Sequence, residues 1–259
     1  MSEDPLEIPL VGGQTSEVVR IGDTVRRSTG PWTAAVHELL RHLEKVEFSG
    51  APRLLGFDDR GREMLTYVEG EPGTRPWPAE LRTDGGLHAY ARLLRGYHDA
   101  VGSFLPPPEA QWAVGPRHLH HGDVVRHGDV GPWNTIWRAG RPVAIIDWDM
   151  AEPGAPILDV AQAALFGVPL QGPEAAELAG FASPPDLRHR LVILCEAYGR
   201  FRVDDVLAAV VELQTLELSR AHQLGGRGVQ PWAGFLARGK VTEFEGYRAW
   251  LTLNIDQLR

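Results

Sequence analysis

Residues 127–149, HGDVGPWNTIWRAGRPVAIIDWD, constrain the fold more than any other part of the chain. The turn-forming sequence Ala-Gly-Arg-Pro at 139–142 separates two short runs of β-branched, apolar and aromatic residues, a pattern that predicts a β-hairpin. If the two strands pair symmetrically, Asn134 lies opposite Asp147 at the open end of the hairpin. Asp129, five residues before Asn134, then comes from the loop that leads into the first strand.

This arrangement would bring three oxygen-bearing side chains to one end of the hairpin. Such a set suits phosphoryl transfer, because one carboxylate can orient an acceptor hydroxyl and take its proton. An Asn oxygen and a second carboxylate can hold Mg²⁺, which prefers hard oxygen ligands. Asp149 shares the strand face of Asp147 if the chain stays extended, and could reach a second metal ion. Any one of these residues alone also suits an ordinary turn, so the prediction rests on their combined spacing.

The rest of the chain predicts a small β-rich part, a linker and a larger helical part. A hairpin is expected over 16–28 and a helix over 34–46 with Thr33 as its N-cap, followed by strands in PRLLGFD and EMLTYVEG. The Pro- and Gly-rich segment GEPGTRPWP marks a lobe boundary. We therefore expect lobes at 1–70 and 79–259 around a hinge at 71–78. Apolar periodicity predicts helices at about 87–101, 157–166, 186–198, 203–224 and 241–258.

Composition excludes some classes of protein. The chain carries 34 acidic and 26 basic residues, a formal charge of −8, which argues against nucleic-acid binding and is compatible with a cationic small ligand. Cys195 is the one cysteine, so no intrachain disulfide forms and a reducing compartment is expected. The N-terminal residues lack the basic region of a secretory signal, and no apolar run is long enough for a membrane span. We expect a cytoplasmic monomer or homodimer.

HGDVGPWN and IIDWD resemble the H-G-D-x-x-x-x-N and I-D-[WFL]-[DE] motifs of the aminoglycoside phosphotransferase and choline kinase family. The resemblance implies an α+β, bilobal, protein-kinase-like fold with a small β-rich N-lobe holding one main helix and a larger, mostly helical C-lobe. It implies a catalytic base at Asp129 and Mg²⁺ ligands at Asn134 and Asp147. His127 would support the loop, and Asp159 would brace it from the start of a helix, where the helix dipole alone also favours an acid.

The resemblance covers roughly residues 10–165 and implies ATP or GTP as phosphoryl donor. VGGQTSEVVRIGD is similar to the family's nucleotide-covering loop, and EMLTYVEGE to its last N-lobe strand and hinge. The family's third-strand lysine has no counterpart, and of the two arginines in TVRR we favour Arg26 over Arg27. Its helix partner would be Glu38 or His37. The expected cofactor-binding residues are Gly13, Gln14, Thr15, Ser16, Arg26, Thr66, Tyr67, Val68 and Glu69.

The sequence His-Gly-Asp occurs twice, ending at Asp123 and at Asp129. Only Asp129 is followed five residues later by an asparagine, whereas Gly128 stands at that distance from Asp123. We therefore assign the chemistry to the second copy.

The function implied is Mg²⁺-dependent transfer of the terminal phosphoryl group to a hydroxyl of a small molecule, with an antibiotic such as an aminoglycoside as first choice. The alternatives are a metabolite kinase (choline, homoserine or sugar), a metal-dependent hydrolase built on the histidine- and aspartate-rich segment 118–129, and a catalytically inactive nucleotide sensor. For a cationic acceptor, the candidate substrate-binding acids are Glu196, Asp204 and Asp205, which equally suit solvated helix faces.

Overall fold

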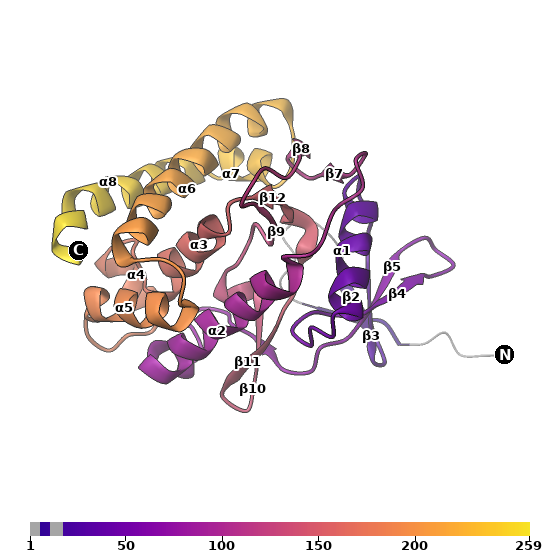
Figure 1. Ribbon diagram of the computed structural model, residues 1–259, viewed down its shortest axis with the longest axis horizontal. Coiled ribbons are helices and arrows are strands. Elements are labelled where there is room, and N and C mark those ends of the chain that lie inside the picture. Colours follow the sequence, from indigo (N-terminus) through magenta and orange to yellow (C-terminus); the bar gives the residue numbers. More distant parts are fainter. Residues whose placement is uncertain (1–5, 11–17) are drawn as a thin grey trace.

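A sheet-based lobe and a mostly helical lobe are seen in the computed structural model, which describes residues 6–10 and 18–259 (Figure 1). The N-lobe sheet is antiparallel, with its five strands in the order β1-β2-β3-β5-β4. Its strands are β1 (Ile8–Pro9), β2 (Val18–Ile21), β3 (Thr24–Arg27), β4 (Leu54–Phe57) and β5 (Glu63–Thr66). The expected hairpin and the two later strands are therefore confirmed.

One main helix, α1 (Thr33–Lys45), belongs to the N-lobe. Its apolar stripe is fully buried and includes Val36, Leu39 and Leu43, as the helical spacing predicts. The predicted N-cap is wrong by one residue, because the helix already includes Thr33 and Trp32 stands at the cap without a side-chain hydrogen bond. The Thr33 hydroxyl instead accepts a hydrogen bond from the N–H of Gly30 at 2.9 Å.

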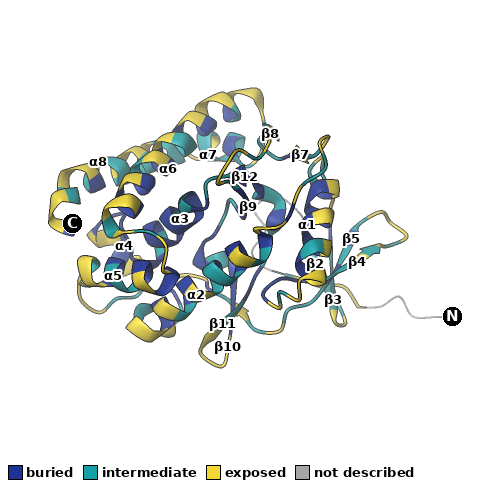
Figure 2. Cartoon of the chain, in the orientation of Figure 1, coloured by how far each residue is buried: buried dark blue, intermediate teal, exposed yellow. Residues whose placement is uncertain are grey.

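The C-lobe is built mainly from helices whose buried sides face one another (Figure 2). The five expected helices are present, and α2 packs on α5, α3 on α6 and α6 on α8. Two short helices, α4 and α7, were not predicted because six residues show too little periodicity. The helices are α2 (Asp84–Val101), α3 (Ile157–Gly167), α4 (Pro173–Leu178), α5 (Leu187–Tyr198), α6 (Val203–Gln223), α7 (Trp232–Ala237) and α8 (Lys240–Leu258). None of these helices is both long and apolar enough to span a membrane.

Short strands and 3₁₀ turns connect the lobes and carry the loops of the site. The strands are β6 (Glu71–Pro72), β7 (Gln111–Trp112), β8 (Gly115–Pro116), β9 (Val124–Arg126), β10 (Thr135–Arg138), β11 (Arg141–Ile145) and β12 (Glu152–Gly154). The 3₁₀ turns are η1 (Glu80–Arg82), η2 (Pro132–Asn134), η3 (Trp148–Met150) and η4 (Gly225–Arg227). The expected linker begins with β6, which pairs with β10.

The hairpin β10–β11 is present, but its register differs from the prediction. Thr135 pairs with Ile145, so Asn134 lies opposite Ile146, whose N–H donates to the Asn134 carbonyl at 2.8 Å. Arg138 pairs with Arg141, so the turn has two residues in place of the expected four, and a bulge between Ile136 and Trp137 restores only one residue of that shift. Asp147 therefore follows the end of the ladder instead of facing Asn134.

Candidate active site

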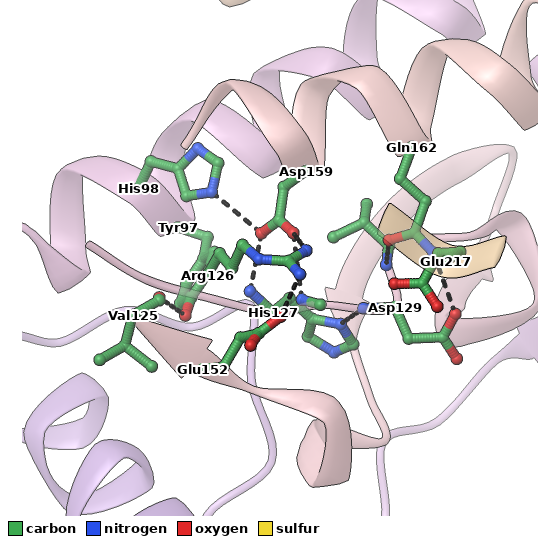
Figure 3. A network of polar contacts seen from close by, with 12 residues as sticks. Tyr97, His98, Val125, Arg126, His127, Asp129, Glu152, Asp159, Gln162 and Glu217 are labelled. Carbon is green, nitrogen blue, oxygen red and sulfur yellow. Dashed lines mark hydrogen bonds and ion pairs between the residues drawn. The ribbon is translucent and has the colours of Figure 1, made fainter. Parts of the chain in front are cut away.

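The loop between β9 and η2 presents Asp129 as a partly buried carboxylate held by three side-chain donors. Asn134 Nδ2 donates to its Oδ2 at 2.8 Å, and Trp133 Nε1 donates to the same oxygen at 3.3 Å. Gln162 Nε2, from α3, donates to Oδ1 at 3.3 Å (Figure 3). Gln162 also accepts the N–H of Val130 at 3.0 Å, so it fixes both the carboxylate and the loop behind it.

The electrostatic surroundings of Asp129 favour proton transfer near neutral pH. Burial raises the pKa of its carboxyl, the nearby charges of Asp147 and Glu217 raise it further, and the hydrogen bonds from Trp133 and Asn134 lower it. The net effect brings the pKa of Asp129 to about 7. A general base is most effective when its pKa lies close to the working pH.

Asp159, in the first turn of α3, makes the contacts that a brace for this loop requires. Its Oδ2 accepts the N–H of His127 at 2.7 Å, and its Oδ1 accepts the N–H of Gly128 at 3.0 Å. His98 Nε2 lies 3.2 Å from Oδ2 (Figure 3). Burial acts to raise the pKa of Asp159, but the hydrogen bond and charge of His98, with the charge of Arg126, outweigh it and bring the pKa to about 2.

His127 is fully buried and connects the loop that carries Asp129 to the end of β11, just before Asp147. Its Nδ1 accepts the N–H of Asp129 at 3.2 Å, so its Nε2 carries the proton and donates to the Ile146 carbonyl at 3.0 Å. Burial lowers the pKa of His127, which keeps the ring neutral. These contacts agree with the supporting role expected for His127.

Asp147 and Asp149 reach the site from a turn and not from an extended strand. Asp147 has left-handed backbone angles (φ 63°, ψ 72°), which are strained for a residue with a side chain and are found preferentially at functional sites. Asp149 lies in the 3₁₀ turn η3 that follows. The expectation that the chain stays extended from Asp147 to Asp149 is therefore wrong, although both carboxylates approach the same partner.

That partner is Arg27, the last residue of β3. Its Nη1 donates to Asp147 Oδ1 at 3.1 Å, its Nη2 donates to Asp149 Oδ1, and its Nε lies 2.5 Å from Glu63 Oε1. Arg26 points to the other face of the sheet, where it donates to Thr24 Oγ1 at 2.6 Å. Strand alternation was predicted correctly, but the face turned toward the site is that of Arg27.

Neither expected helix partner pairs with this arginine directly. Glu38 is exposed and pairs with Arg41. The acid is Glu63, the cross-strand neighbour of Arg27 on β5, and His37 Nε2 lies 2.8 Å from its Oε2. An acid in the first position of the apolar strand EMLT was a signal in the sequence, but only the strand register connects it to Arg27.

The expected nucleotide contacts are only partly described. Gly13, Gln14, Thr15 and Ser16 lie outside the described residues. Residues 66–69, just before the expected hinge, line a cavity of about 570 Å³, in which the Arg20 guanidinium lies 3.7 Å from the centre of the Tyr67 ring. The N–H groups of Thr66 and Tyr67 are already used, by the carbonyls of Arg53 and Asp23. Thr66, Tyr67, Val68 and Glu69 line this cavity, whereas Arg27, Asp129, Asn134 and Asp147 do not.

The acidic residues expected to bind substrate are not beside Asp129. Asp205 caps the start of α6 and Glu196 lies on α5, whereas the acid of α6 that lies near Asp129 is Glu217 (Figure 3). Glu217 lies twelve residues after Asp205 on α6, about 18 Å further along the helix. Glu196, Asp204 and Asp205 were chosen for charge alone, and charge does not reveal which end of a helix meets the loop.

Asn134 and Asp147 have the donor chemistry that Mg²⁺ requires. Both hydrogen bonds of the Asn134 side chain, to the Asp129 carbonyl and to Asp129 Oδ2, use its Nδ2, so its amide oxygen could serve as a metal donor. One carboxylate and one amide oxygen suit an ion that keeps water and phosphate as its other ligands. Within 6–10 and 18–259, no three His, Cys, Asp or Glu residues are grouped to hold a metal ion, so the segment 118–129 gives the hydrolase alternative no support.

The sheet lobe, the helical lobe and the catalytic loop define a protein-kinase-like phosphotransferase. The model of the phosphotransferase enzyme family (APH) matches residues 109–192. The trifolitoxin immunity protein of Rhizobium leguminosarum bv. trifolii is 41% identical over 204 residues, which cover 76% of this chain and 75% of that protein. The chain belongs to the phosphotransferase enzyme family, as the sequence motifs predicted.

Solved structures confirm the fold. A choline/ethanolamine kinase family protein from Mesorhizobium loti superposes with a TM-score of 0.55 at 18% identity, covering 96% of this chain and 92% of that one. The GDP complex of aminoglycoside 2'-phosphotransferase-IIIa gives a TM-score of 0.58 at 15% identity, covering 98% and 95%. Macrolide 2'-phosphotransferase MphH from Brachybacterium faecium gives 0.51 at 16% identity, covering 96% and 91%.

The two His-Gly-Asp copies can be distinguished by glycine-to-alanine changes. Both glycines have positive φ, but a Cβ at Gly128 would lie 2.0 Å from the Met150 carbonyl oxygen, whereas one at Gly122 would meet nothing within 4 Å. We expect Gly122→Ala to lower the free energy of unfolding by about 1 kcal/mol through its backbone alone. Gly128→Ala should cost a further 1–3 kcal/mol, roughly, from the clash. Urea unfolding measures both, and equal losses would contradict the prediction.

Removing the charge of Asp159 should destabilise the fold. We expect Asp159→Asn to lower the free energy of unfolding by about 3 kcal/mol at pH 7, because a buried ion-pair network loses one partner. The pKa of Asp159 is lower in the folded protein than its ordinary 3.8, so this stabilisation is complete above pH 4, roughly, and is lost as the pH falls through 2, roughly.

Urea unfolding across a pH series tests this. Asp99→Asn is the matched control, because Asp99 is exposed and pairs only with Arg95; its change should stay within about 0.5 kcal/mol. An Asp159→Asn loss as small as that of the control would mean that the carboxylate does not stabilise the fold.

Proposed function

We propose that this phosphotransferase moves the terminal phosphoryl group of ATP or GTP to a hydroxyl of an antibiotic-type small molecule, with Mg²⁺ as cofactor. The observation that carries the proposal is the Asp129 carboxylate, fixed by Asn134 and Gln162 and with a pKa of about 7. A carboxylate in this state can orient an acceptor hydroxyl and accept its proton during transfer.

The other residues of the site support the same reaction. Asn134 and Asp147 would hold Mg²⁺, which when bound neutralises charge on the transferred phosphoryl group. His127 and Asp159 keep the loop in place, and Gln162 orients Asp129. Since the donor is a nucleoside triphosphate and Cys195 is a free, buried thiol, we propose that the reaction takes place in the cytoplasm.

Two observations support an antibiotic acceptor. The relative at 41% identity is an immunity protein whose name refers to a toxin, trifolitoxin, and similar folds include aminoglycoside and macrolide phosphotransferases. Glu217, which already accepts a hydrogen bond from Arg220 at 3.0 Å, adds negative charge near Asp129, and this charge favours an acceptor with a cationic group close to the reacting hydroxyl. A cationic metabolite is the second candidate, because a choline/ethanolamine kinase family protein shares the fold.

Asp129→Asn should abolish acceptor phosphorylation. The amide cannot accept the hydroxyl proton, so we expect turnover to fall by at least about 100-fold, with nucleotide affinity largely retained. The assay measures ADP or GDP release from Mg²⁺-ATP and Mg²⁺-GTP with aminoglycosides, macrolides, peptide antibiotics, choline and sugars as acceptors. Acceptor-stimulated release that persists at the wild-type rate in the variant would refute the role of Asp129.

Glu217→Gln should weaken binding of a cationic acceptor. We expect KM for the acceptor to rise by about tenfold, the scale of one charge-assisted hydrogen bond, while KM for the nucleotide stays unchanged. Asp204→Asn is the matched control, since it removes one acid at the far end of α6. If Asp204→Asn raised KM and Glu217→Gln did not, the acceptor would lie at the other end of the helix.

A further inference from the structure

The carboxylates of Asp147 and Asp149 already face a cation, the guanidinium of Arg27. We propose that Arg27 is an internal counter-ion for Asp147 and Asp149, which a divalent cation must displace and whose guanidinium then becomes available to the nucleotide phosphates. This inference rests on the proposed function, because it concerns the same nucleotide site. It assigns Asp149 to the arginine, in place of the second metal ion expected from the sequence.

The contacts show how the arginine is held. Its outer nitrogens bind Asp147 and Asp149, while its inner nitrogen, Nε, lies against Glu63. The position of Glu63 is itself fixed, because Glu63 pairs with Arg27 across the two strands and because His37 Nε2 lies 2.8 Å from its Oε2. The guanidinium can therefore release its outer partners without losing its inner one.

Burial shows from which side a ligand enters. The side chains of Arg27 and Glu63 are only 7% and 4% exposed. Those of Asp149 and Asp147 are more open, at 18% and 43%. Exposure thus increases from the Glu63 end of the guanidinium to the Asp147 end. A hydrated metal ion or a phosphate would reach Asp147 first, which is the partner that the proposal requires Arg27 to release.

The balance of charge in this group also supports displacement of Arg27 by a metal ion. One guanidinium faces three carboxylates, so these four side chains together carry a net charge of −2. That surplus can attract a divalent cation, but two of the carboxylates are already bonded to Arg27. Because like charges repel strongly at a partly buried site, Arg27 and a metal ion cannot both stay close to Asp147 and Asp149 without cost.

The side chain of arginine is suited to such an exchange. Its planar fork can bond to two carboxylates and, equally, to two phosphate oxygens, whereas the ammonium of lysine is a point charge. Arg26 cannot take this role, since it lies on the opposite face and pairs with Asp58 at 3.8 Å. The two neighbouring arginines therefore offer a controlled comparison within one strand.

The test measures Mn²⁺ binding to the nucleotide-free protein, using the electron paramagnetic resonance signal of the Mn²⁺ that stays free in solution. We expect Arg27→Met to bind Mn²⁺ about tenfold more tightly than the wild type, because the carboxylates lose their internal cation. Arg26→Met removes the same charge from the other face and should leave the affinity unchanged. Arg27→Lys keeps the charge and should bind Mn²⁺ within about twofold of the wild type.

A second variant controls for the destabilisation that an unpaired Glu63 would cause. Arg27→Met leaves Glu63 buried without its cation, so the double change Arg27→Met with Glu63→Gln removes both buried charges and should show the same gain. Binding of a fluorescent nucleoside diphosphate with Mn²⁺ is measured in parallel, and Arg27→Met should weaken it by about tenfold.

Unchanged or weaker Mn²⁺ binding in both Arg27→Met variants would overturn the proposal, as would an equal gain in Arg26→Met. These outcomes are distinct from failure of the proposed function, which would appear as a wild-type protein that turns over nucleotide with no acceptor. The Mn²⁺ measurement uses neither nucleotide nor acceptor, so it judges the counter-ion independently.

Discussion

The buried carboxylate of Asp159, on the first turn of α3, holds the loop 127–134 that carries Asp129, and the rest of the site is arranged around that contact. Asp159 accepts the backbone N–H groups of His127 and Gly128, and His98 approaches the same carboxylate from α2. A buried charge is costly unless hydrogen-bonded, so the loop and the helices are held together by the need to satisfy it. Asp129 owes its position to this arrangement, because it is the next residue after the two bound amides.

The N-lobe contributes to the site through electrostatics as much as through packing. Arg27 crosses from the sheet to Asp147 and Asp149, so the two lobes are joined by ion pairs at the point where phosphate and metal would bind. A phosphotransferase needs positive charge for phosphate and negative charge for metal in the same small space. In this chain the two kinds of charge contact one another directly, because the Arg27 guanidinium bonds to Asp147 and Asp149 while its Nε lies against Glu63.

Much of the architecture could be predicted from local patterns. The helices of the C-lobe and the strands of the N-lobe follow apolar periodicity, and the motif spacing brings Asp129 and Asn134 into direct contact. The errors have a common origin in pairing and orientation. A turn shorter than expected, only partly offset by a bulge, moved the partner of Asn134 by one residue, and the twofold alternation of β3 did not reveal which of its faces meets the helical lobe.

The sequence by itself determined the family and the two-lobed fold class, because these depend on short-range spacing and on periodicities that a local segment carries. Only the tertiary structure decided that Arg27 faces the site, that Glu63 is its partner, and that Gln162 and Glu217 lie beside Asp129. These residues come from segments far apart in the chain. Their meeting depends on strand register and on how helices pack, which no local pattern of residues specifies.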